Sequence, residues 1–182
     1  MAGVTSRKAS YWLVFVIWPL LALYHALSNF RQPHARNILW AFTIFYGFTF
    51  VISIDNSNSD INRYVSDLMV MIDDKVTFDE FTESLYDVDS RSVDILQPFL
   101  TFVVAQVSGS PAVLIATFAF VFGYFYSRNL SFVIEHLNGN LSRATIFLFV
   151  VFAFIIPIWD LNGFRFYTAA HIFFYGAIRY LF

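Results

Sequence analysis

Four apolar runs, separated by polar breaks, dominate the pattern along the chain. They cover residues 11–27, 38–54, 112–126 and 145–159. Each run is close to the shortest length with which a helix can cross a bilayer, and none alternates between polar and apolar residues as barrel strands do. Backbone groups inside a bilayer must satisfy their own hydrogen bonds. The runs therefore predict membrane helices.

Two weaker runs complete the pattern. Residues 93–107 are interrupted by Asp94, Gln97 and Pro98, which leaves open either a span with a polar face or a re-entrant segment. Residues 166–182 form a last apolar run that carries two ionisable side chains and reaches the chain end without a polar tail. This ending leads us to expect that a longer protein continues beyond the sequence.

The predicted fold is all-α, a polytopic transmembrane helix bundle of about six membrane helices. We expect residues 1–182 to form a single integral membrane domain, the N-terminal half of a longer protein. An amphipathic helical segment is predicted between the second and third membrane helices.

That segment, residues 55–92, is the longest polar stretch and is predicted to lie outside the membrane. Its apolar residues recur at the spacing of two short amphipathic helices. Thr77-Phe78-Asp79-Glu80 has the pattern of a capping box at the start of the second helix. The apolar positions are Ile61, Tyr64, Leu68 and Met71 or Ile72 in the first helix, and Phe78, Phe81, Leu85 and Val88 in the second.

Composition supports a membrane protein. Hydrophobic residues make up 58% of the 182 residues and charged residues only 13%, whereas a soluble domain carries about 25% charged residues. A chain this short cannot bury so much apolar surface in one core. The sequence pI of about 6.0 gives no basic footprint for nucleic acid. With no cysteine, disulfides, thiolate zinc sites and Cys nucleophiles are excluded, and no metal or cofactor motif is present.

The formal net charge of −2 conceals two opposite contributions. Residues 55–94 hold 11 of the 13 acidic residues and 3 of the 11 basic ones, a charge of −8, so the rest of the chain carries +6. Acids at these spacings favour solvated helix faces over a metal or cationic-substrate site. The count of Lys and Arg favours a cytoplasmic N-terminus, whereas the compact Arg31–Arg36 cluster favours the opposite orientation. Topology stays open on charge alone.

Ionisable residues at membrane depth are costly, which makes each of them a functional candidate. Arg165 follows the turn Asn162-Gly163 and begins the last helix. A guanidinium there suits a phosphate or carboxylate, or it snorkels to lipid headgroups. His171 is either a general base or phosphate donor, or a hydrogen-bonding partner of a neighbouring helix.

Three other polar residues remain candidates. Asp94 and Gln97 share a helix face and could line a polar groove, although Asp94 is better explained as a helix cap. Arg128 follows Tyr124-Phe125-Tyr126, so anchoring at a membrane interface is favoured over ligand binding.

Several segments together resemble the EpsG-like family of polytopic bacterial inner-membrane proteins, which are associated with capsule, exopolysaccharide and O-antigen loci. The family is similar to Wzy-type polymerases, which join oligosaccharide repeat units carried on a lipid diphosphate. The likeness covers nearly the whole chain. It is carried by residues 48–52 (FTFVI), 59–64 (SDINRY), 94–102 (DILQPFLTF), 122–129 (FGYFYSRN) and 156–171 (IPIWDLNGFRFYTAAH).

The resemblance implies a multi-pass protein of the bacterial inner membrane that acts as a repeat-unit polymerase, a glycosyltransferase-type enzyme without a cofactor. Its substrate would be oligosaccharide linked to undecaprenyl diphosphate. The lipid bilayer and other polysaccharide-assembly proteins would be its partners. The family's proteins are longer than this chain, and their acidic segment is expected on the outer side.

With this substrate, we assign Arg165 to the diphosphate of the leaving lipid, whose negative charge grows in the transition state. His171, or an acid such as Asp60, is the candidate that takes the proton from the acceptor hydroxyl. The candidate substrate-binding residues are Arg63, Tyr64, Gln97 and Arg128.

Two other functions remain open. A carrier or flippase-like permease for lipid-linked sugars would use the same buried arginine and aromatic belt without proton transfer. The other is a non-catalytic membrane subunit that assembles with a polymerase. Inverted repeats, which would favour a transporter, are not evident in the six runs.

Overall fold

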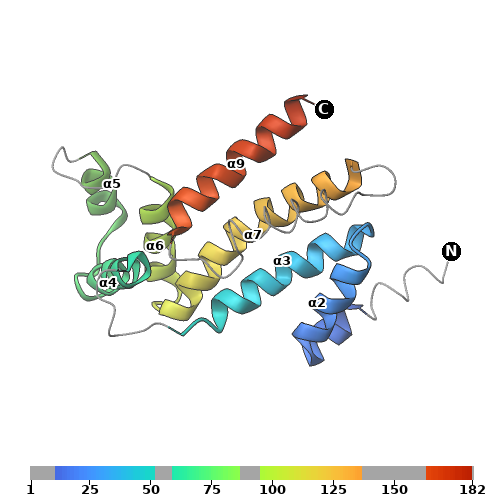
Figure 1. Ribbon diagram of the computed structural model, residues 1–182. Helices are drawn as coiled ribbons and strands as arrows, with labels where there is room; N and C mark the ends of the chain where they lie inside the picture. Colours follow the sequence, from blue (N-terminus) through green and yellow to red (C-terminus); the bar gives the residue numbers. More distant parts are fainter. Residues whose placement is uncertain (1–10, 52–58, 87–94, 137–162, 182) are drawn as a thin grey trace.

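The computed structural model describes residues 11–51, 59–86, 95–136 and 163–181, and all regular structure in these ranges is helical (Figure 1). The predicted all-α class is therefore confirmed. Asp94, Val88 and the apolar run 145–159 lie outside the described residues. The helices are α2 (Pro19–Ser28), α3 (Pro33–Phe48), α4 (Asp60–Asp73), α5 (Phe78–Tyr86), α6 (Leu96–Val107), α7 (Pro111–His136) and α9 (Phe164–Leu181).

The first apolar run is helical, but it is divided near a proline. Residues 11–17 are helical, and α2 begins anew at Pro19, which has no backbone N–H to continue the hydrogen-bond ladder. Beyond the break, Ala22 and Ala26 pack against Ala35 and Ile38 of α3. Small side chains let these two helices approach closely.

Helices α3 and α7 lie antiparallel and side by side through the middle of the molecule (Figure 1). Their contact depends on two glycines. A Cβ atom at Gly47 would lie 2.5 Å from the Ala119 Cβ atom and 2.9 Å from the Ile115 carbonyl oxygen. A Cβ atom at Gly123 would lie 2.7 Å from the Thr43 Cβ atom. Small residues at such contacts are typical of helices that pack in membranes.

Helix α9 runs parallel to α7 and packs on another face of it. Near its start, the Phe164 ring stacks on Phe118 with centroids 4.2 Å apart. Further along, Tyr175 meets Phe125 edge-on at 5.4 Å. Helix α7 is therefore the central element, with α3 and α9 both packed against it.

The two amphipathic helices predicted in the acidic segment are present as α4 and α5, and the capping box is confirmed. The backbone N–H of Thr77 donates to Glu80 Oε2 at 2.8 Å, and the Glu80 N–H donates to Thr77 Oγ1 at 3.4 Å. The hydrogen bonds that the Thr77 backbone N–H and hydroxyl donate to the Glu80 carboxylate hold the pKa of Glu80 below its usual value. Phe81 is buried as predicted, but Phe78 is exposed at the first turn of the helix.

Helix α6 fixes these two helices to the bundle. Its Phe102 ring stacks on Phe81 of α5 at 4.5 Å, and the Gln106 side chain donates to the Val76 carbonyl oxygen in the α4–α5 link at 2.9 Å. At 12 residues, α6 is about 18 Å long, too short by itself to cross a hydrocarbon core of about 30 Å. Within its described bounds it is a short apolar helix rather than a complete span.

Among the described helices, one is long and apolar enough to cross a bilayer, Pro111–Glu135 within α7. More than half of it is buried inside the molecule. This helix is weak evidence for membrane association.

The glycine contact between α3 and α7 yields a stability prediction. Gly47→Ala should lower the free energy of unfolding by about 1–3 kcal/mol, because the added methyl group meets the α7 backbone. Gly176→Ala is the matched control, since a Cβ atom there has no neighbour within 4 Å and alanine favours the helix. SDS-induced unfolding in detergent micelles measures both, and equal midpoints for the two variants would contradict the packing argument.

Candidate functional site

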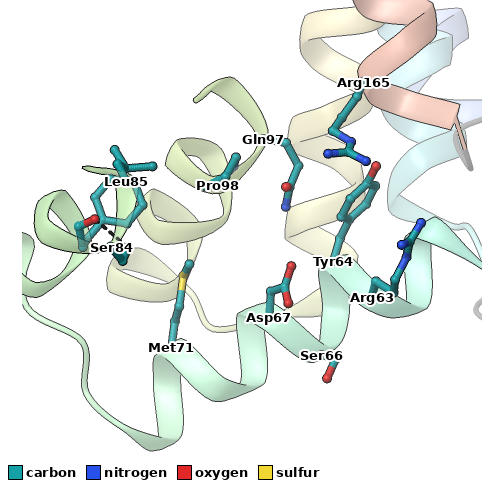
Figure 2. A pocket seen from close by; sticks show the side chains of 11 residues that line it. Arg63, Tyr64, Ser66, Asp67, Met71, Ser84, Leu85, Gln97, Pro98 and Arg165 are labelled. Atoms are coloured by element: carbon teal, nitrogen blue, oxygen red, sulfur yellow. Dashed lines mark hydrogen bonds between the residues drawn. The ribbon is translucent and has the colours of Figure 1, made fainter. Parts of the chain in front are cut away.

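A pocket lies where the acidic helices meet the start of α9, and it has a volume of about 510 Å³. Figure 2 shows Arg165 pointing from α9 toward the tips of Gln97 and Tyr64, while Asp67 rises from α4 into the same space. Four helices contribute to the walls. The lining residues are Arg63, Tyr64, Ser66, Asp67, Met71, Phe81, Ser84, Leu85, Gln97, Pro98 and Arg165.

An aromatic stack sets the position of Arg165. Tyr64 of α4 meets Phe118 edge-on at 5.4 Å, and Phe118 stacks on Phe164, the residue before Arg165. All three rings are buried. Because the stack joins α4, α7 and α9, it places the Arg165 guanidinium carbon 6.0 Å from the centroid of the Tyr64 ring. Arg165 is thus directed toward the pocket by packing on both sides of α7.

The pocket brings two guanidinium groups and one carboxylate together. Burial raises the pKa of Asp67, whereas the positive charges of Arg63 and Arg165 act to lower it. Asp60 lies at the first turn of α4 and pairs with Arg63 one turn later. The Arg63 side chain remains 61% exposed, so this ion pair contributes little to stability and leaves the arginine accessible.

Gln97 forms the polar part of the α6 wall. It is 5% exposed, its side-chain amide donates to Thr101 Oγ1 at 3.0 Å, and the Thr101 hydroxyl donates to the Gln97 carbonyl oxygen. These local bonds hold the amide against the helix at the edge of the pocket. A fixed polar group of this kind orients a ligand rather than supplying charge.

Most of the predicted site residues therefore meet in one place. Arg63, Tyr64, Gln97 and Arg165 line the same pocket, and Asp60 is bonded to one of them. They are drawn from α4, α6 and α9, which are far apart in the sequence.

His171 lies elsewhere, buried between α7 and α9. Asn129 of α7 donates to the His171 carbonyl oxygen at 2.8 Å and lies 3.2 Å from its Nδ1 atom. Phe122 and Tyr126 meet the imidazole edge-on. His171 is 2% exposed and does not line the pocket. Its contacts correspond to the alternative that the sequence left open, a hydrogen bond to a neighbouring helix.

Arg128 also lies away from the pocket, near the end of the bundle where α3 begins. Its guanidinium donates to Asn37 Oδ1 at 2.8 Å and lies 4.8 Å from the centroid of the Tyr124 ring and 5.7 Å from that of Trp40. The predicted aromatic surroundings are present. The predicted set of substrate-binding residues is therefore divided between two locations.

Asp67 is the pocket residue that the sequence reasoning missed. It stands four residues after Arg63 and three after Tyr64, so all three lie on neighbouring positions of one helix face. That spacing was the available signal. The spacing did not single out Asp67, because many other acidic residues of the segment also stand near basic or aromatic residues.

No group of three or more His, Cys, Asp or Glu side chains in the described ranges is arranged to hold a metal ion. Comparison with known proteins finds no matching family model, no similar curated protein and no similar solved structure. The function must therefore be argued from the pocket itself. Two guanidinium groups suit an anion such as a phosphate, and a neighbouring carboxylate can accept a proton.

The contacts of His171 predict a structural effect at Asn129. Asn129→Ala should lower the free energy of unfolding by about 1 kcal/mol, because the buried imidazole and carbonyl lose their donor. Any affinity of the pocket for inorganic phosphate should stay unchanged, since Asn129 does not line it. SDS-induced unfolding and a binding titration measure the two effects. An unchanged midpoint, or a loss of affinity without a loss of stability, would overturn this interpretation.

Proposed function

We propose that this chain is part of a multi-pass protein of the bacterial inner membrane. The large exposed apolar side chains support this, because they continue along helices other than α7. Val16 is 79% exposed, Ile17 82% and Phe173 70%. Exposed apolar surface of this extent is typical of contact with lipid.

The arrangement of charges supports an orientation that the sequence left open. Arg31, Arg36 and Arg128 lie toward the end of the bundle where α3 begins, whereas the acidic helices α4 and α5 lie at the other end (Figure 1). Basic residues favour the cytoplasmic side. The pocket would then face the outer side of the membrane.

The function that the pocket supports best is a polysaccharide repeat-unit polymerase acting on oligosaccharides linked to undecaprenyl diphosphate. The observation that carries this proposal is the convergence of Arg63 and Arg165, from helices about 100 residues apart in the chain, beside Asp67. The two arginines would bind the diphosphate. Tyr64 and Gln97 would contact the sugar next to it.

In the proposed reaction, the acceptor hydroxyl attacks the anomeric carbon of the donor sugar. The bond between that carbon and the phosphate oxygen breaks, and the lipid diphosphate leaves with the bonding electron pair. Arg165 stabilises the charge that develops on the leaving group. Asp67, whose pKa is raised by burial, takes the hydroxyl proton and replaces Asp60 and His171 as the candidate base.

Arg165→Gln tests the role of the pocket. Losing a charged hydrogen bond of about 1.5–3 kcal/mol should weaken binding of undecaprenyl diphosphate in mixed micelles at least about tenfold. In cells, long polymer should disappear while single repeat units stay attached to their acceptor. Arg179→Gln is the matched control, because Arg179 is exposed on the same helix and does not line the pocket. A normal distribution of polymer chain lengths in Arg165→Gln would contradict the proposed role of Arg165 in binding the diphosphate.

Asp67→Asn separates catalysis from binding. At neutral pH it should abolish polymer formation while tightening diphosphate binding by up to about fivefold, since one negative charge beside the two arginines is removed. As pH falls through the raised pKa of Asp67, the native carboxylate also becomes neutral, so the affinities of the two proteins should converge. Binding titrations across pH 4–8 measure this. A permease or a non-catalytic subunit would instead retain its function in Asp67→Asn, which would contradict a polymerase.

A further inference from the structure

A second cationic cluster lies away from the pocket, between the first turn of α3 and the second half of α7. It consists of Arg36 and Arg128 with Asn37, Trp40 and Tyr124. Arg36 directly precedes Asn37, whose side chain accepts a hydrogen bond from Arg128 at 2.8 Å, so the two arginines are neighbours and their charges interact. Like charges repel, and holding them together in a partly buried position is unfavourable unless something compensates.

The protein partners of Arg128 fix its direction without neutralising it. Asn37 and Ser127 accept hydrogen bonds from its guanidinium at 2.8 Å and 3.2 Å, and the Tyr124 and Trp40 rings lie against it. Trp40 is itself held by a hydrogen bond from its indole N–H to the Phe120 carbonyl oxygen. Every one of these partners is neutral.

Arg36 is even less compensated. Its Nε atom is buried and has no hydrogen-bond acceptor among the described residues. Within those same ranges, Arg63 with Asp60 is the one ion pair, so neither Arg36 nor Arg128 is paired with a carboxylate. A buried donor without an acceptor costs about 1–3 kcal/mol. Two neighbouring guanidinium groups with no carboxylate partner among the described residues suit a phosphate group, which accepts bidentate bonds from arginine.

We infer that Arg36 and Arg128 form a binding site for the phosphate group of an anionic lipid headgroup, separate from the pocket. The aromatic rings beside Arg128 suit the membrane interface, where tyrosine and tryptophan lie at headgroup level. The site therefore sits where lipid phosphates are abundant. It would bind the protein to anionic lipid at the end of the bundle where α3 begins.

The test uses the full chain in nanodiscs of phosphatidylcholine with a minor fraction of phosphatidylglycerol. After transfer to detergent, native mass spectrometry counts the phosphatidylglycerol molecules that stay bound. Arg36→Gln should weaken phosphatidylglycerol binding about tenfold. This variant should fold, because Arg36 Nε has no protein acceptor to lose. Arg128→Gln should show a similar loss, whereas Arg31→Gln, an exposed arginine in the nearby loop, controls for general charge.

Three outcomes decide the question. Loss of phosphatidylglycerol in both variants, with retention in Arg31→Gln, supports the site. Displacement of phosphatidylglycerol by millimolar inorganic phosphate would show that the site also accepts free phosphate. Equal binding by the native chain and Arg36→Gln would overturn the inference. Binding of undecaprenyl diphosphate in the pocket, measured on the same variants, should stay normal, so failure here is distinct from failure of the proposed function.

Discussion

The arrangement of the candidate site depends on the aromatic stack centred on Phe118. This ring is 1% exposed and contacts Tyr64 on one side and Phe164 on the other. It therefore joins the acidic segment, the central helix and the last helix in a single contact. Such ring pairs contribute about 0.5–1.5 kcal/mol each beyond the burial of their area. The stack thereby fixes Tyr64 of α4 and Arg165 of α9 beside one another at the pocket.

The sequence predicted the local elements best where a chemical signal and a periodic pattern agreed. Thr77 and Glu80 mark the start of α5, and the spacing of Ile61, Tyr64 and Leu68 defines the buried face of α4. Both patterns reflect interactions within a few residues of one another, so tertiary packing does not alter the helices that they predict. The division of the first run near Pro19 was not predicted, because hydropathy alone does not register a missing backbone donor.

The sequence identified most residues of the candidate site, but it did not show which of them lie together. Arg165 stood out because an ionised group next to an apolar run is costly wherever it lies. Asp67 did not stand out, since its significance comes from Arg165, which lies far along the chain and is brought close by the Phe118 stack. His171 stood out for the same reason as Arg165, and yet Asn129 holds it within a helix interface. The unfavourable free energy of placing an ionisable side chain in an apolar run marks a residue as important. Only its tertiary neighbours show which interaction offsets that free energy.

The two pairs of arginines differ in whether a carboxylate lies beside them. Arg63 and Arg165 share their pocket with Asp67, so protonation of one carboxylate changes the net charge that a ligand meets. In the proposed polymerase, this partial compensation of charge would ease release of the product. Arg128 donates hydrogen bonds only to neutral partners among the described residues, and neither it nor Arg36 forms an ion pair there. In the two proposals, turnover relies on the first arrangement and lasting attachment to a phosphate on the second.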